Sequence, residues 1–229
     1  MAVSISVKQT AKLYLRNPEE SELGKKIISE SINLIAKLGF EEFTFKKLAA
    51  SIKSTEASIY RYFENKHKLL IYLISWYWAW LEYQIDYRTN NISDPIKKIK
   101  ISIKIIAEIS SQDDPNSLHI DESQLHKIVV AESAKAYLTK NVDSENKAGL
   151  FANYQSLCKK ISDIIQEINP QLPYPRAMAS NLIETAHEQI FFSQHLPGLS
   201  DVPTTKTDYS RISEFLELIF FSTVKRNVK

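Results

Sequence analysis

The sequence predicts an all-α protein of about nine helices. Three observations predict this fold class: only four of the 229 residues are glycine, apolar residues recur at helical spacing, and no run alternates as a strand does. A tight two-residue hairpin usually needs Gly or Asn-Gly, so four glycines cannot supply the turns of a many-stranded sheet. The glycines also stand too far apart to form a Gly-rich phosphate loop.

Nine segments carry the helical pattern. They are 23–38, a short segment from 44, a segment from 54 or 55 to 63, 65–87, 95–109, 119–138, 144–168, 175–195 and 208–225. Gly39 follows the first, where a left-handed residue commonly ends a helix, and Thr44 is a suitable N-cap for the second. Asp94-Pro95 marks a helix start and Asn169-Pro170 a helix end.

Composition narrows the class of protein further. The single cysteine, Cys158, excludes an internal disulfide framework and fits a reducing compartment. Residues 1–16 show no continuous apolar segment of a secretory signal. Leu69 to Leu81 is uncharged but has only 13 residues, against the roughly 20 that span a bilayer, so it predicts a buried helix. We therefore expect a cytoplasmic protein that is not in the membrane.

Charge is distributed unevenly along the chain. Residues 1–70 hold 12 Lys and Arg against 8 Asp and Glu, whereas the remaining residues hold 17 against 19. The formal net charge of +2 therefore hides a basic N-terminal part and a slightly acidic remainder. A basic surface of this kind suits a polyanionic partner.

The segment from Phe45 to Glu64 has the pattern of two short helices joined by a tight turn. Ala49 is the small residue that lets the helices approach, and three apolar residues, Leu48, Ile52 and Ile59, close the angle between them. The second helix then projects a face of small and polar residues, which suits entry into a major groove about 12 Å wide. Those residues are Thr55, Glu56, Ser58 and Arg61, with Tyr60 and Tyr62 beside them.

Leu48-Ala49, the run Ser54-Thr55-Glu56-Ala57-Ser58-Ile59-Tyr60-Arg61-Tyr62-Phe63, and Asn65-Lys66-x-x-Leu69-Leu70 resemble the DNA-binding region of TetR/AcrR-type bacterial transcription regulators. The local match covers about residues 23–70, and the rest resembles the family only in length, helix count and position. The resemblance implies an N-terminal three-helix helix-turn-helix domain followed by a helical-bundle effector and dimerisation domain. We expect an N-terminal arm at 1–20, the DNA-binding domain at 21–66 and the helical domain at 67–229.

The resemblance also implies the DNA contacts, residue by residue. Phosphates would meet Thr44, either Lys46 or Lys47, and Lys66. Bases would meet Thr55, Glu56, Ala57 and Ser58, and the DNA backbone would meet Tyr60 and Tyr62, with Arg61 on the same outer face. Hydroxyls, lysines and helix N-termini are all suitable phosphate partners. The basic arm with Lys8, Lys12 and Arg16 is expected either to lie along DNA or to be disordered.

Two residues depart from the family pattern at the turn. Lys53 stands where the family usually has glycine, and a left-handed lysine costs on the order of 1 kcal/mol. Ser54 stands where an apolar residue is usual. Glu56 is also unexpected near phosphates: it would either accept a hydrogen bond from cytosine N4 or cap the helix N-terminus, and the capping role is preferred.

The helical body offers candidate residues for an effector pocket, although helical aromatics more often form core. The candidates are Trp76, Tyr77, Trp80, Tyr83, His126, Tyr137, Asn153, Tyr154, Asn181 and Glu188. A mostly apolar wall favours an apolar or aromatic effector over a highly charged one. His119, His126, His187 and His195 show no H-E-x-x-H spacing, and no G-x-S-x-G occurs, so we expect no enzyme, no metal and no cofactor.

The last two helices present broad apolar faces. The resemblance places them in a homodimer interface; the alternative is that they only complete the core of the monomer. The candidates are Leu182, Ile183, Ala186, Ile190, Ile212, Phe215, Leu216, Ile219 and Phe220. Two recognition helices about 34–36 Å apart would read a palindromic operator in double-stranded DNA. We thus expect a repressor that a small, largely apolar effector releases; a helical scaffold protein without specific DNA binding is the alternative.

Overall fold

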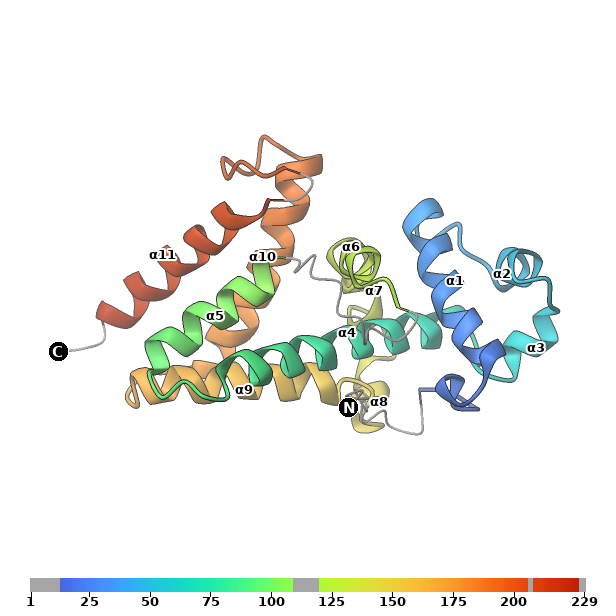
Figure 1. Ribbon diagram of the computed structural model, residues 1–229, viewed down its shortest axis with the longest axis horizontal. Coiled ribbons are helices and arrows are strands. Elements are labelled where there is room, and N and C mark those ends of the chain that lie inside the picture. The colour runs from blue at the N-terminus through green and yellow to red at the C-terminus, as the bar shows by residue number, and fades with distance from the viewer. Residues whose placement is uncertain (1–12, 109–119, 206–207, 227–229) are drawn as a thin grey trace. The chain divides into compact units, whose positions relative to one another are not determined.

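The computed structural model describes residues 13–108, 120–205 and 208–226, with side chains to residue 224, and all regular structure in these ranges is helical. The predicted all-α fold is confirmed. Figure 1 shows the elements, which are η1 Pro18–Glu20, α1 Glu22–Leu38, α2 Phe45–Ser51, α3 Glu56–Tyr60, α4 Lys66–Thr89, α5 Pro95–Ala107, α6 Glu122–Glu132, α7 Ala134–Tyr137, α8 Val142–Lys147, α9 Ala152–Ile168, α10 Pro175–His195 and α11 Ser210–Arg226. Lys8, Lys12, the predicted loop at 112–117 and His119 lie outside the described residues.

Eleven α-helices replace the predicted nine in the described ranges, because two predicted helices are each divided. The segment predicted at 119–138 forms α6 and α7, which meet at Ser133. The segment predicted at 144–168 forms α8 and α9, separated at Gly149, whose φ of 80° is incompatible with a continuing α-helix. The third predicted helix also ends early, at Tyr60, where the Tyr62 N–H bonds the Ile59 carbonyl in a tighter turn.

The chain divides into two compact units, residues 1–78 with 111–153 (unit 1) and residues 79–110 with 154–229 (unit 2). Helix α4 contributes residues to both units. The functional boundaries expected at residues 20 and 66 stay a prediction.

The core of unit 1 forms around one face of α1. Ile28, Ile32 and Ile35 are buried there, as their 3–4 spacing predicts, and α1 packs against η1, α2 and α6. Residues 69–78 of α4 are all buried, which explains why this run carries no charge. None of the helices in the described ranges has the length and apolar content needed to cross a membrane.

The core of unit 2 forms where α5, α10 and α11 pack against one another. Seven of the nine residues predicted for dimerisation are buried within this unit: Leu182, Ile183, Ala186, Ile190, Ile212, Leu216 and Phe220. Phe215 and Ile219 are half-buried. These side chains are therefore part of the core of unit 2, as expected if the apolar faces complete the core of the monomer. Their contact with a second copy of the chain stays a prediction.

Candidate nucleic-acid interface

Helix α1 supports the candidate interface, and residues next to it in the sequence cap both of its ends. The Ser21 hydroxyl accepts a hydrogen bond from the Gly24 N–H at 3.1 Å, which satisfies one of the free amides of the first turn. At the other end Gly39 adopts a φ of 78° and donates its N–H to the Ile35 carbonyl at 2.8 Å. The predicted helix end at Gly39 is confirmed.

The turn between α2 and α3 is formed by Lys53 in a left-handed conformation, with a φ of 54°. The Lys53 N–H bonds the Ala50 carbonyl at 3.3 Å and the Ser54 N–H bonds the Ala49 carbonyl at 2.9 Å. These two bonds make a Schellman C-cap, which normally carries glycine at the left-handed position. The prediction that Lys53 takes the place of that glycine is confirmed, and neither Lys53 nor Ser54 prevents the turn from forming.

Helix α3 presents the residues predicted to face bases. Thr55 is its N-cap, with its hydroxyl accepting from the Ser58 N–H at 3.2 Å and lying 3.0 Å from the Ser58 hydroxyl. Arg61 donates to that same Ser58 oxygen at 3.2 Å, so three polar side chains form one surface network. Ala57 is exposed beside them.

Glu56 is the first residue of α3 and is exposed. A carboxylate in the first turn of a helix interacts favourably with the helix dipole. This position agrees with the preferred capping role, while an additional contact with cytosine stays a prediction.

Tyr60 and Tyr62 are two residues apart but lie in different environments. The Tyr60 ring is 47% exposed and packs edge-on against Phe45, with ring centroids 5.0 Å apart. Tyr62 is only 2% exposed, and its hydroxyl lies 2.8 Å from the Ser21 hydroxyl. The Tyr60 side chain is thus accessible for its predicted contact with the DNA backbone. The Tyr62 hydroxyl instead connects the end of α3 to Ser21 at the start of α1.

The N-terminus of α2 carries Thr44, Lys46 and Lys47, all exposed. Thr44 caps the helix by accepting from the Lys47 N–H at 3.2 Å. Lys47 donates to the Glu42 carbonyl at 2.7 Å and pairs with the Glu42 carboxylate at 3.2 Å. Lys46 has no hydrogen-bond or ion-pair partner within the described ranges, so of these two lysines it is the one available to a phosphate.

Lys66, predicted to hold a phosphate, is held by backbone carbonyls. Its ammonium donates to the carbonyls of Phe40, Glu41 and Phe43 at 3.0, 2.9 and 3.2 Å. An ammonium group has three N–H donors, and all three are used here. A phosphate at Lys66 would therefore have to replace a carbonyl of the loop between α1 and α2, and the phosphate role stays a prediction.

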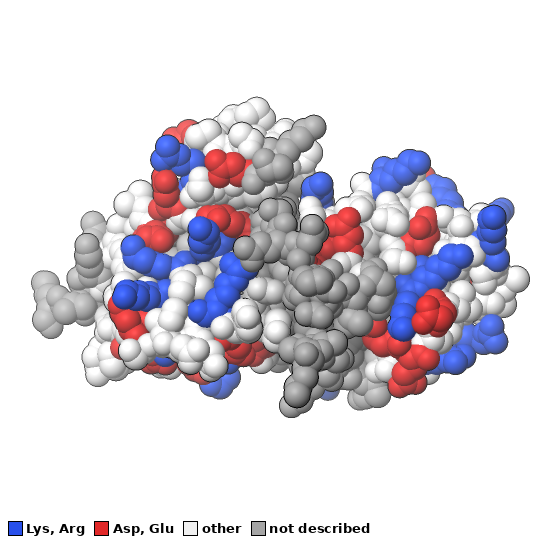
Figure 2. Space-filling model, in the orientation of Figure 1, with Lys and Arg blue, Asp and Glu red and all other residues white. Residues whose placement is uncertain are grey.

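The surface charge of this region is mixed. On the face drawn in Figure 2, the Lys and Arg atoms over α1–α3 lie among Asp and Glu atoms. Attraction to an anion therefore depends on where individual cations such as Lys46 lie, more than on the net charge of the region.

The residues predicted for an effector pocket are divided between the two units. In unit 1, the Tyr77 hydroxyl lies 2.5 Å from His126 Nδ1, and Asn153 donates to the Ser75 carbonyl and hydroxyl at 3.2 and 2.9 Å. Trp76 is buried and Tyr137 is half-buried in the same unit.

In unit 2, Tyr154 donates to Glu184 at 2.5 Å, Trp80 is buried, and Tyr83 stacks on Tyr87 with centroids 6.1 Å apart. Asn181 and Glu188 lie on the exposed side of α10. The pocket assignment of all ten residues stays a prediction.

Sequence reasoning missed Glu132, which lies at the end of α6 and is 8% exposed. Its carboxylate accepts from the Phe40 N–H at 3.0 Å and pairs with Lys135 at 2.7 Å. Lys135 also pairs with Glu41 at 3.0 Å. The sequence signal for this role was the position of Glu132 directly after the apolar run at 128–131. A carboxylate buried with such a run is costly unless its charge is paired.

Residues 27–73 match the family described as bacterial regulatory proteins, tetR family. The match identifies a TetR-type domain in this N-terminal part of the chain. The matched range begins inside α1 and ends inside α4, so it contains the whole of α2, the Lys53 turn and α3. None of the curated proteins compared with the sequence matches it.

Solved structures of other proteins share the fold over most of the chain. AibR in complex with isovaleryl coenzyme A and operator DNA is 16% identical, with a TM-score of 0.58, and the alignment covers 85% of this chain and 96% of AibR. A tetR-family regulatory protein from Rhodococcus RHA1 is 16% identical, with a TM-score of 0.60 and coverage of 89% and 97%. The fatty acid degradation regulator FadR from Bacillus halodurans is 14% identical, with a TM-score of 0.58 and coverage of 93% and 98%.

Proposed function

We propose that this protein is a TetR-type transcription regulator that binds a palindromic operator as a homodimer through α3. The observation that carries the proposal is the face of α3, where Thr55, Glu56 and Ala57 are exposed directly after the Lys53 turn that ends α2. Small and polar side chains on such a helix suit base edges in a major groove.

The rest of the domain supplies contacts that position the helix. The exposed Thr44 and Lys46, with Tyr60, are suited to phosphates, which fix the register of a protein on the duplex without reading sequence. One α3 of five residues reads few bases. Two copies about 34–36 Å apart would read two half-sites, so a homodimer is part of the proposal.

A small, largely apolar effector is proposed to release the protein from DNA. AibR was crystallised with isovaleryl coenzyme A and operator DNA, and FadR is a fatty acid degradation regulator. Isovaleryl coenzyme A and fatty acids both contain an acyl chain, the apolar kind of group proposed here. Effector binding in the helical body would shift the population toward a conformer that binds the operator less well, which requires different affinities for the two conformers. We further propose that the protein is cytoplasmic and has no catalytic activity.

The experiment is a salt titration of DNA binding by the full chain, using a random-sequence duplex of about 30 base pairs. Wild type is expected to bind with an affinity that falls steeply as salt rises. Lys46→Gln should weaken binding to all sequences and reduce the magnitude of the salt slope by about 0.9 per protomer. Lys97→Gln, which removes an exposed lysine of α5, is the matched control and should leave the slope unchanged.

Selection from a random library should then enrich a palindrome whose half-sites lie about one helical turn apart. Absence of salt-dependent binding in wild type would favour the scaffold alternative. Light scattering checks the assembly, and a monomer at micromolar concentration would contradict the palindromic mode.

A further inference from the structure

Residues Leu13–Glu20, here called the strap, pack across the start of α1. Leu13 is 1% exposed, and the Leu15 N–H donates to the Tyr62 carbonyl at 2.8 Å. Tyr14 packs edge-on against Tyr72, with centroids 6.1 Å apart. The strap is therefore an ordered part of unit 1. Its backbone is hydrogen-bonded directly to Tyr62, two residues after the end of α3.

Gly24 shows how closely the strap approaches α1. A Cβ at this position would lie 2.2 Å from the Pro18 carbonyl oxygen and 2.6 Å from the Pro18 Cα. Any other residue would force the strap or the helix to move. The absence of a Cβ at Gly24 thus allows Pro18 of the strap to pack directly against α1.

Arg16 is exposed, and its guanidinium carbon lies 5.4 Å from the centre of the Tyr62 ring. A guanidinium over an aromatic face is attracted to it, which limits the orientations of the long side chain. No carboxylate in the described part of the chain pairs with Arg16.

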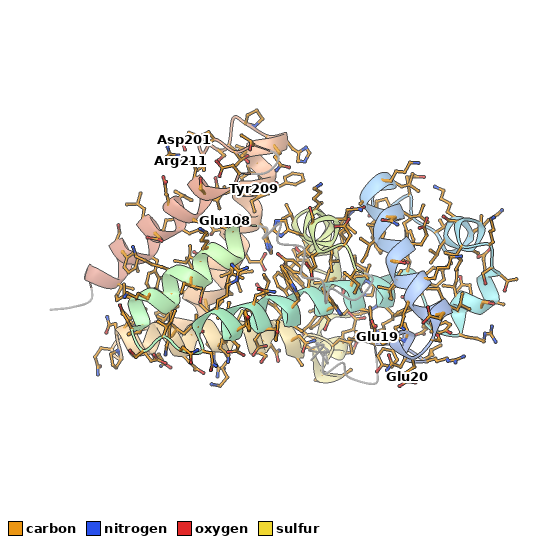
Figure 3. All side chains as sticks on the ribbon, in the orientation of Figure 1. Glu19, Glu20, Glu108, Asp201, Tyr209 and Arg211 are labelled. Carbon is orange, nitrogen blue, oxygen red and sulfur yellow. The ribbon has the colours of Figure 1, made fainter. Side chains whose placement is uncertain are left out.

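The acidic residues nearest to Arg16 in the sequence, Glu19 and Glu20, accept hydrogen bonds from other side chains. Glu19 accepts from the Tyr72 hydroxyl at 2.8 Å, and Glu20 accepts from the Asn17 amide at 3.0 Å; Figure 3 labels both acids beside the first turn of α1. The positive charge of Arg16 is therefore presented to solvent without a counter-charge.

The length of α3 indicates what Arg16 faces when the helix is in a groove. Five helical residues span about 7.5 Å, whereas the major groove is about 12 Å wide. Side chains just beyond the two ends of α3 consequently lie near the phosphates that border the groove. Arg61 and Tyr62 directly follow the C-terminal end of α3, and Arg16 lies over the Tyr62 ring.

We propose that Arg16 is a DNA-phosphate contact, which the strap and the Tyr62 ring hold at the C-terminal end of α3. The inference rests on the proposed function and adds a cation from outside the helix-turn-helix. It also assigns Tyr62 a positioning role, which agrees with its burial and with the 2.8 Å contact between its hydroxyl and that of Ser21. A guanidinium suits this contact because its planar donors can bind two phosphate oxygens at once.

The test uses the full chain and the random-sequence duplex, because a phosphate contact does not depend on sequence. Arg16→Gln removes the charge and keeps most of the side-chain length; Arg16→Lys keeps the charge. Arg176→Gln is the matched control, since Arg176 is also exposed and has no partner in the described ranges. Thermal unfolding of each variant monitors the fold.

Arg16→Gln should reduce the magnitude of the salt slope by about 0.9 per protomer and weaken binding about eightfold per protomer at 0.1 M salt. Arg16→Lys should retain most of the slope, and Arg176→Gln should match wild type. A wild-type slope in Arg16→Gln would overturn the inference while leaving the proposed function standing. Reduced affinity with an unchanged slope would likewise overturn it, because that result reports a structural role only. If wild type itself shows no salt-dependent binding, the proposed function fails and the inference fails with it.

Discussion

The Glu132 carboxylate accepts a hydrogen bond from the backbone N–H of Phe40 at 3.0 Å, across 92 residues of sequence. Phe40 lies in the loop that follows α1, and the same loop gives three carbonyls to Lys66. Lys135 extends the contact by pairing with both Glu132 and Glu41. The loop between α1 and α2 is therefore held by side chains from α4, α6 and α7.

Glu132→Ala should destabilise the protein by about 1–3 kcal/mol, because it leaves the Phe40 N–H buried without an acceptor. Urea unfolding of the full chain measures the change. Glu132→Gln keeps an acceptor oxygen for the Phe40 N–H, so its unfolding free energy should fall distinctly less than that of Glu132→Ala. Equal stability of the alanine variant and wild type would show that the Phe40 contact contributes nothing.

Lys53→Gly should stabilise the protein by about 0.5–1 kcal/mol. Glycine avoids the cost of about 1–2 kcal/mol that a side chain incurs at positive φ, although it restores some entropy to the unfolded chain. Lys53→Ala removes the same charge but keeps a Cβ, so it should give no gain. The comparison of the two variants by denaturant unfolding isolates the backbone effect, and an equal gain in both would assign it to charge instead.

Gly24→Ala should destabilise by about 1–3 kcal/mol. Alanine in a helix interior normally stabilises by about 1 kcal/mol relative to glycine, but here the new Cβ would meet the Pro18 carbonyl at 2.2 Å. Gly198→Ala is the control, since a Cβ there meets nothing within 4 Å. Thermal unfolding distinguishes the outcomes: stabilisation by Gly24→Ala would mean that the strap yields without cost.

Stability should fall on acidification because His187 is buried in unit 2. Burial lowers the pKa of His187 from 6.5 to about 4, so between these values the unfolded chain binds a proton that the folded chain does not. The neutral form gives its full contribution above pH 6.5, and about 3 kcal/mol is lost as the pH falls from 6.5 toward 4.

The measurement is the unfolding free energy from about pH 7.5 to about pH 4.5, comparing wild type with His187→Gln. The variant should show a shallower decline whatever its absolute stability. His195→Gln, at an exposed histidine, should decline as wild type does. A wild-type decline in His187→Gln would contradict the prediction.

Much of the DNA-binding domain could be predicted because its determinants are local. Thr44 and Thr55 cap their helices, Gly39 ends α1, and the left-handed turn falls on Lys53, all from residues within five positions of one another. The body was less predictable. Two predicted helices are divided, and residues proposed for a dimer face are buried in unit 2, because an apolar helical face looks the same whether its own chain or a second chain covers it.

The all-α class, the helix-turn-helix and its unusual turn can be predicted from the amino acids alone, since spacing, caps and the missing glycine act over a few residues. Which charged side chains already have a hydrogen-bond or ion-pair partner depends on the tertiary structure. Lys66 is bound to three carbonyls and Glu132 to a distant N–H, whereas Arg16 is left exposed over Tyr62. Hydrogen bonds and ion pairs act over a few ångströms, and the partners here lie from 23 to 92 positions apart in the chain, so folding alone brings them within reach.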